Sequence, residues 1–261
     1  MFPKEHGAWN ALLVSLFAGW IALGQWNPIA LAATLIWVSG FVLRAPILTF
    51  LQYRKADQAK ARKALFFALL LLIVFAFSAI YFFRNVPQAA QRLVLFLGLP
   101  IGILICAIAV IRRNLRLVIV EVLGFAGLCL LAPVLALCSP LIPLSKAFWL
   151  YGLFGGYFIL AIFYIKVRQK WVALMKDGIH SSLDLRMEDG AAPLLLHALF
   201  VGAVYWANPW MALGPLWALG RVLAGVMGGK PDLPIMRLGV REMIHSLVYL
   251  ILVMGAWKVM T

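Results

Sequence analysis

The stretch ALFFALLLLIVFAFSAIYFF, residues 64–83, decides the fold of this chain. It holds no charged residue, and Lys63 and Arg84 close it at its two ends. A helix rises about 1.5 Å per residue, so about 20 residues cross the ~30 Å hydrocarbon core of a bilayer. The apolar residues are continuous and do not alternate as in a barrel strand. The stretch therefore predicts a transmembrane helix.

The rest of the chain repeats this pattern. It is 65% hydrophobic and 12% charged, whereas soluble domains carry about 25% charged residues. This composition excludes a soluble fold and predicts one integral membrane domain over residues 1–261. We expect an all-α, polytopic membrane helix bundle of about nine transmembrane helices. The expected spans are Ala8–Gly24, Pro28–Leu51, Ala64–Phe83, Leu93–Ile111, Leu117–Leu137, Ala147–Ile165, Ala191–Ala207, Pro209–Gly228 and Val240–Met260.

Charge is distributed unequally between the two sides of this bundle. If the polar joints between spans are numbered alternately, all 9 carboxylates and all 4 histidines fall on the side of the N-terminus. Most lysines and arginines share that side, and the other side has only Arg84, Arg92, Lys146 and Lys258. The positive-inside rule then predicts a cytoplasmic N-terminus and an external C-terminus. Topology and lipid head groups account for the net charge of +14, so we do not expect nucleic-acid binding.

A pair of acids in the joint between the sixth and seventh spans could hold a metal. Asp184 and Glu188 are four residues apart, which on a helix places both carboxylates on one face. Such a pair can hold Mg²⁺, and the ion can in turn hold a diphosphate. The alternative is an ordinary solvated joint whose acids pair with bases such as Arg186. Trp171 in the same joint could cover an isoprenoid tail or lie among head groups.

The joint between the second and third spans is basic. Arg54 and Lys63 lie at its two ends, with Asp57 as its single acid. The bases could clamp a phosphate. The alternative is that they satisfy topology and contact anionic lipid head groups.

Two arginines lie inside the spans themselves. Arg44 and Arg221 stand about two turns from a helix end, where a charge normally faces a protein interior or a watery cavity. Glu121 and Glu242 are the acids at a similar depth, and we expect them to be the partners. A polar cavity open to the cytoplasm is one interpretation, and snorkelling of the long side chains is the other.

Three residues of metal-ligand type lie near the same depth. Glu242 and His245 form an E-x-x-H pattern, and His197 lies two turns into the seventh span. Di-metal bundles use this pattern twice with further glutamates, and here it occurs once. Hydrogen-bonded polar residues are therefore favoured over a transition-metal site.

Two motifs resemble the YwiC-like bacterial membrane protein family. They are PKEHGAW at Pro3–Trp9 and RLGVRE at Arg237–Glu242. The resemblance implies a bacterial cytoplasmic membrane protein and no particular reaction. Glu5, His6 and Arg237 become candidate site residues because they lie in these motifs.

A more distant resemblance is to the UbiA superfamily of intramembrane prenyltransferases. That superfamily has nine helices, a cytoplasmic N-terminus, and acidic motifs after helices two and six that bind Mg²⁺ and a prenyl diphosphate. Asp184 and Glu188 resemble the second motif, D-x3-D, with Glu in the last place. The first motif, N-D-x2-D-x3-D, has only Asp57 as a counterpart. The resemblance implies a UbiA-like topology.

The leading hypothesis is a UbiA-like prenyltransferase, or a degenerate relative, that binds an isoprenoid diphosphate or lipid head group at the cytoplasmic face. Mg²⁺ would bind Asp184 and Glu188. The alternatives are a non-enzymatic membrane subunit or assembly factor of a respiratory complex, with a protein partner, and a small-solute transporter. The residues expected to contact the substrate are Glu5, His6, Arg54, Asp57, Lys63, Arg116, Glu121, Arg186, Arg237 and Glu242.

Overall fold

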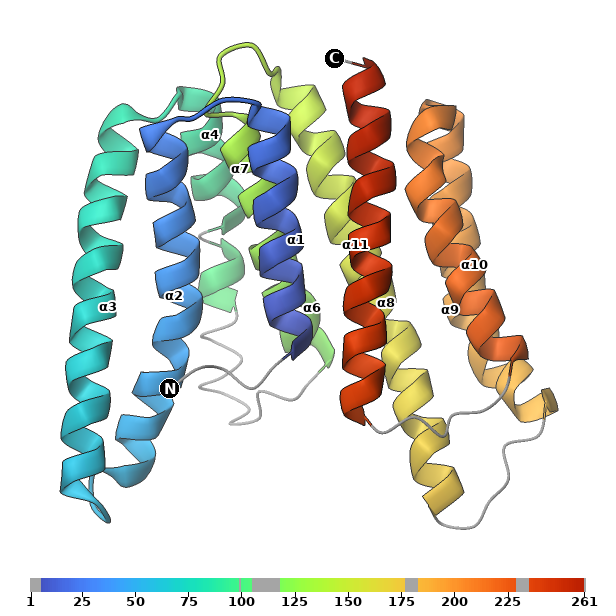
Figure 1. Ribbon diagram of the computed structural model, residues 1–261, viewed down its shortest axis with the longest axis horizontal. Coiled ribbons are helices and arrows are strands. Elements are labelled where there is room, and N and C mark those ends of the chain that lie inside the picture. The colour runs from blue at the N-terminus through green and yellow to red at the C-terminus, as the bar shows by residue number, and fades with distance from the viewer. Residues whose placement is uncertain (1–5, 99, 105–117, 177–182, 229–234, 261) are drawn as a thin grey trace. The chain divides into compact units, whose positions relative to one another are not determined.

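The computed structural model describes residues 6–98, 100–104, 118–176, 183–228 and 235–260, and all regular secondary structure in that part is helical. This confirms the all-α prediction (Figure 1). The elements are α1 (His6–Leu23), α2 (Pro28–Tyr53), α3 (Gln58–Asn85), α4 (Gln88–Leu93), η1 (Val94–Gly98), α6 (Val118–Cys129), α7 (Leu131–Ala136), α8 (Leu144–Lys176), α9 (Leu183–Ala207), η2 (Pro209–Ala212), α10 (Leu213–Met227) and α11 (Ile235–Met260).

Seven segments within the described residues are long and apolar enough to cross a membrane. They are Pro28–Tyr53, Gln58–Asn85, Val118–Ala136, Leu144–Leu174, Arg186–Ala207, Pro209–Met227 and Gly239–Val259. Two shorter apolar helices, Gly7–Leu23 and Gln88–Leu104, overlap the two remaining expected spans, Ala8–Gly24 and Leu93–Ile111. Much of the expected span Leu93–Ile111 lies outside the described residues. By helix length and hydropathy, the chain is a multi-pass membrane protein.

The chain divides into two compact units. Unit 1 contains residues 1–102 and 127–148, and unit 2 contains residues 103–126 and 149–261. The expectation of a single membrane domain stays a prediction.

Unit 1 is built around the antiparallel hairpin of α2 and α3 (Figure 1). The side chain of Asn27 caps α2 by accepting from the backbone N–H of Ile29 at 2.8 Å. α1 packs against α7 at Gly19, where a Cβ atom would come within 2.7 Å of the Leu135 Cβ. Small residues permit such close helix contacts in lipid.

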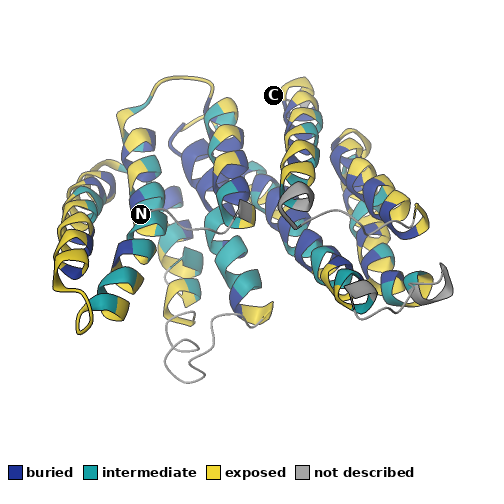
Figure 2. Ribbon diagram, turned by 60° about the horizontal axis from the view of Figure 1, so that its bottom comes forward, coloured by how far each residue is buried: buried dark blue, intermediate teal, exposed yellow. Residues whose placement is uncertain are grey.

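α3 exposes most of its surface (Figure 2). Only 6% of its apolar segment is buried in the protein. Its buried positions near the start are the small residues Ala61, Ala64 and Ala68, and it packs mainly against α2. An apolar helix with such exposure requires lipid or a partner helix around it, which agrees with the prediction drawn from residues 64–83.

Unit 2 differs from the expectation in the length of α8. We expect the sixth span to end at Ile165, but the helix continues to Lys176. Trp171 therefore lies within a helix, is fully buried, and packs with Tyr164 and Val226. Of the two interpretations of Trp171, burial inside the protein contradicts a position among head groups, and a role in covering an isoprenoid tail stays a prediction. The helix continues past Ile165 because the sequence has no glycine or proline between Ile165 and Gly178.

The expected spans Ala191–Ala207 and Pro209–Gly228 leave a single residue between them, and the structure has the same short turn. α9 ends at Ala207 and η2 begins at Pro209, so Asn208 alone lies between them. The Asn208 side chain accepts from the backbone N–H of Trp210 at 3.1 Å and of Met211 at 3.3 Å. Proline at the first position and a capping asparagine both favour this helix start.

Candidate functional site

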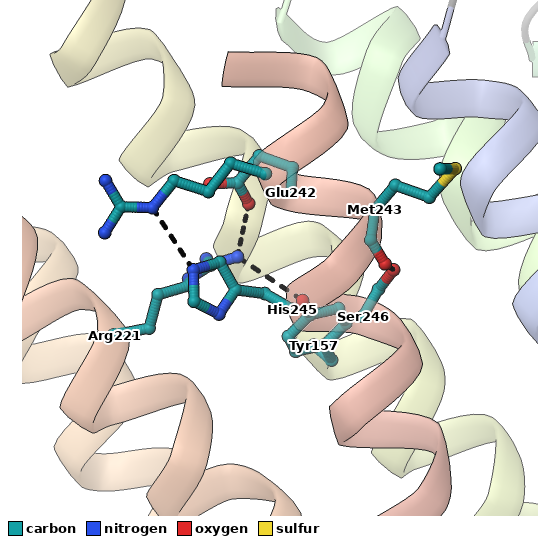
Figure 3. A network of polar contacts seen from close by, with 7 residues as sticks. Tyr157, Arg221, Glu242, Met243, His245 and Ser246 are labelled. Carbon is teal, nitrogen blue, oxygen red and sulfur yellow. Dashed lines mark hydrogen bonds and ion pairs between the residues drawn. The ribbon is translucent and has the colours of Figure 1, made fainter. Parts of the chain in front are cut away.

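Arg221 on α10 is one of two buried arginines among the described residues of unit 2, and the other is Arg168 on α8. Arg221 Nη1 donates to the Glu242 carboxylate of α11 and, at 3.3 Å, to the Tyr157 hydroxyl of α8 (Figure 3). The side chain of Arg221 is 2% exposed and that of Glu242 is 12% exposed. The expected pairing of Arg221 with Glu242 is thereby confirmed. Three helices hold one guanidinium within a unit that otherwise buries mostly apolar groups.

Two further side chains of α8 complete this cluster. The guanidinium carbon of Arg221 lies 5.2 Å from the ring centroid of Tyr164 and 5.6 Å from that of Tyr157. Tyr164 also interacts electrostatically with Arg168, whose Nη1 donates to the Gly225 carbonyl at 3.2 Å. We call Tyr157, Tyr164, Arg168, Arg221 and Glu242 the arginine centre.

The arginine centre has more donors than the surrounding protein satisfies. Among the described residues, Nε and Nη2 of Arg221 and Nε of Arg168 are buried and have no hydrogen-bond partner. A guanidinium has five N–H donors, and an orphaned buried donor is unfavourable. The centre is therefore suited to a ligand that accepts hydrogen bonds and carries negative charge.

Two histidines flank the arginine centre and interact electrostatically with Arg221. His197 Nδ1 donates to the Pro193 carbonyl at 2.7 Å, and Arg241 Nε donates to His245 Nε2 at 3.4 Å. The other ring nitrogen of each histidine is buried without a partner among the described residues. Both imidazoles are therefore held in place with one nitrogen unused.

The same contacts argue against the transition-metal alternative. Glu242 binds Arg221, and His245 Nε2 accepts from Arg241. In the described part of the chain, no group of three or more His, Cys, Asp or Glu side chains could hold a metal ion. The two side chains of the E-x-x-H pattern, Glu242 and His245, thus each contact an arginine.

The predicted residues of the joint after α2 lie in unit 1. Arg54, Asp57 and Lys63 are exposed, and the Asp57 side chain caps α3 by accepting from the backbone N–H of Lys60 at 2.9 Å. Lys60 in turn lies 3.7 Å from the ring centroid of Tyr53. Asp57 therefore has a structural role at a helix start. A role of these residues in binding a substrate stays a prediction.

The cap gives a direct test of what Asp57 does. Asp57→Ala should lower the free energy of unfolding by about 1 kcal/mol, because α3 loses the acceptor for an orphan N–H. Asp57→Asn should keep wild-type stability, since asparagine caps helices equally well. Unfolding in mixed micelles with increasing sodium dodecyl sulfate measures both. Equal losses in the two variants would mean that the negative charge matters and not the cap.

The other predicted residues lie in both units, and two of them lie outside the described residues. Glu121 pairs with Lys166 at 2.8 Å and not with an intramembrane arginine. Glu188 and Arg186 lie on α9, as does Asp184, whose side chain is not described. His6 and Arg237 lie in α1 and α11, again with undescribed side chains, and Glu5 and Arg116 lie outside the described residues. α9 begins at Leu183, so Asp184 and Glu188 lie four residues apart on one helix, and their binding of a metal stays a prediction.

Sequence reasoning missed three members of the arginine centre. Tyr157, Tyr164 and Arg168 are spaced by seven and four residues, which places them on one face of α8. This polar stripe was the signal that could have found them. The bases after Ile165 instead suggested the end of the span.

Comparison with known proteins places the first half of the chain. Residues 2–136 match the model of the family described as YwiC-like protein, which confirms the resemblance seen at Pro3–Trp9. The match ends before α8, so it does not include the arginine centre. No curated protein matches the chain. No solved structure matches it. Because the match covers more than half of its length, this multi-pass membrane protein belongs to the YwiC-like protein family.

Proposed function

We propose that the protein binds a lipid with an anionic head group at the arginine centre. The observation that carries this proposal is Arg221, a buried guanidinium of which only Nη1 has partners among the described residues. Phosphate and diphosphate oxygens accept from two guanidinium nitrogens at once, which makes arginine the preferred side chain for them.

The charge of the centre supports the same ligand class. Arg168 and Arg221 are two cations, and Glu242 is the only acid among the five residues. Arg241 adds a further cation that interacts with Tyr164. Charges in membrane-spanning helices normally mark a substrate or ion site. An anionic ligand would neutralise the excess of positive charge.

A lipid is favoured over a soluble anion because the centre is carried by α8, α10 and α11. Each of these helices contains a segment long and apolar enough to span a membrane. The apolar chain of the lipid would contact their surfaces while its head group reaches the arginines. From the distribution of lysine and arginine along the chain, we propose that the arginine centre lies toward the cytoplasmic face of a bacterial inner membrane.

The ligand that we propose is an isoprenoid diphosphate, the class implied by the resemblance to prenyltransferases. In that case Asp184 and Glu188 would hold Mg²⁺, since they share a face of α9 and carboxylate oxygens are the ligands that Mg²⁺ takes in proteins. The ion would neutralise charge on a departing diphosphate if prenyl transfer takes place. Arg221 would orient the diphosphate, and Tyr157 and Tyr164 would exclude water from it.

A binding assay with tritiated geranylgeranyl diphosphate and Mg²⁺ on nanodisc-embedded protein tests the proposal. Wild-type protein should bind the probe, and Arg221→Gln should weaken binding by about tenfold or more, because a charge-assisted hydrogen bond is lost. Arg84→Gln, which removes a cation of unit 1, should bind as wild type. Absence of wild-type binding at high micromolar probe would eliminate the proposal.

A second candidate function is a subunit or assembly factor of a membrane complex. It is favoured by α3, because a helix with 6% of its apolar segment buried could contact a partner helix. Purification in mild detergent distinguishes the two. A stoichiometric membrane partner that is lost when Phe77, an exposed residue of α3, is replaced by alanine would support this candidate.

A further inference from the structure

The unused donors of Arg221 are enclosed by the protein. Its Nε and Nη2 have no accessible surface, and the Arg221 side chain as a whole is 2% exposed. An anion can reach these nitrogens only if a neighbouring group moves away. The arrangement therefore describes the closed state of the site, in which the guanidinium already has a negative partner.

Glu242 is the neighbour best placed to move. At 12% it is more exposed than Arg221, and it comes from a different helix, α11. Among the described residues, the buried tyrosines Tyr157 and Tyr164 of α8 also contact the Arg221 guanidinium. Cations over aromatic rings are attracted to them without a formal charge. Departure of Glu242 would leave Arg221 held by α8 and available to a new anion.

We propose that Glu242 is an internal competitor, a resident counter-ion that the anionic head group must displace from Arg221. This inference rests on the proposed function and adds a regulatory contact to it. The carboxylate and the ligand offer oxygens to the same guanidinium, so the measured affinity is the intrinsic affinity reduced by the fraction of protein in the closed state.

The proposal predicts that the conservative variant Glu242→Gln binds the anionic ligand more tightly than wild type. Glu242→Gln keeps an amide oxygen that can accept from Arg221 but removes the charge, so the closed state becomes weaker. Loss of the Glu242 charge should therefore strengthen binding of the anionic ligand to Arg221. Coupling between close, desolvated charges is strong enough that we expect about tenfold tighter binding of geranylgeranyl diphosphate.

The matched control removes another carboxylate of the same unit. Asp189 pairs with Lys170 at 2.7 Å and accepts from Trp171 Nε1 at 3.1 Å. Asp189→Asn removes the same charge while keeping an acceptor, and it should bind the probe as wild type. If Asp189→Asn gains as much affinity as Glu242→Gln, the effect is one of overall charge and the proposal is wrong.

The experiment measures the dissociation constant of tritiated geranylgeranyl diphosphate for the full chain in nanodiscs, with inorganic diphosphate as competitor. Tighter binding by Glu242→Gln supports the proposal, and wild-type or weaker binding by a folded variant overturns it. If Glu242→Gln does not fold, Glu242→Asp replaces it, because the shorter side chain should give a smaller change in the same direction. If wild type and variants all fail to bind, the proposed function itself fails.

Inorganic diphosphate separates the source of the anion. If it displaces the probe only weakly, the isoprenoid chain contributes to affinity and the ligand is a lipid. If it binds as tightly as the probe, the site recognises a free anion, and the lipid part of the proposed function is overturned while the role of Glu242 stands.

Discussion

Arg221→Met will lower the free energy of unfolding by about 3–5 kcal/mol, the largest effect that we expect from any single substitution. The substitution removes the cation and leaves Glu242 as a buried charge beside Tyr157. A carboxylate without its partner in a low-dielectric interior is strongly unfavourable. Unfolding in mixed micelles of mild detergent and sodium dodecyl sulfate measures the loss.

A double variant distinguishes the contribution of the Arg221–Glu242 ion pair to stability from that of the packing of the Arg221 side chain. Arg221→Met combined with Glu242→Gln should regain most of the stability, since no unpaired charge remains. This result would show that the pair contributes little net stability and is retained for another reason, such as binding. If the double variant is as unstable as Arg221→Met, packing of the arginine side chain is what stabilises the protein.

Gly225→Ala should be the second most damaging substitution. A Cβ atom at this position would lie 1.7 Å from the Tyr164 hydroxyl oxygen, so the ring or α10 must move. Overpacking of this kind costs about 1–3 kcal/mol. The same movement would shift a ring that lies against Arg221, so binding of an anionic lipid should weaken as well. Unfolding in mixed micelles and the nanodisc binding assay measure the two effects.

Gly220 on the same helix supplies the control. A Cβ atom there meets nothing within 4 Å, so Gly220→Ala should keep or slightly raise stability. Tyr164→Phe introduced together with Gly225→Ala should recover part of the loss, because it removes the clashing oxygen. An equal loss for Gly220→Ala and Gly225→Ala would assign the effect to the backbone of α10 and not to Tyr164.

The apolar runs predicted the spans well because hydropathy reports where the chain meets lipid. It does not report where a helix ends. The bases from Lys166 onward indicated a joint, yet α8 continues to Lys176 because its sequence has good helical propensity after Ile165 too. Arg168 was therefore assigned to a joint, and the face of α8 that it shares with Tyr157 and Tyr164 was missed.

The pairing of charges was predictable only in part. Arg221 and Glu242 lie in consecutive long helices near their shared end, so their contact follows from antiparallel packing. Glu121 was expected to meet an intramembrane arginine and instead pairs with Lys166. Composition tells which charges need partners, whereas the choice of partner depends on which helices are neighbours. Asp57 shows a second limit, because a carboxylate counted as a ligand serves as a helix cap.

The order of the helices has a consequence for biosynthesis. Asn208 is the only residue between α9 and η2, which leads directly into α10. The helices on the two sides of Asn208 therefore leave the ribosome as one nascent hairpin with a very short turn. Arg221 belongs to this hairpin, and Glu242 is made 21 residues later. At about 5–20 residues per second, translation leaves the arginine in the growing chain without its acid for roughly one second or more. Until α11 follows, the hairpin carries a cation into the membrane without its carboxylate partner.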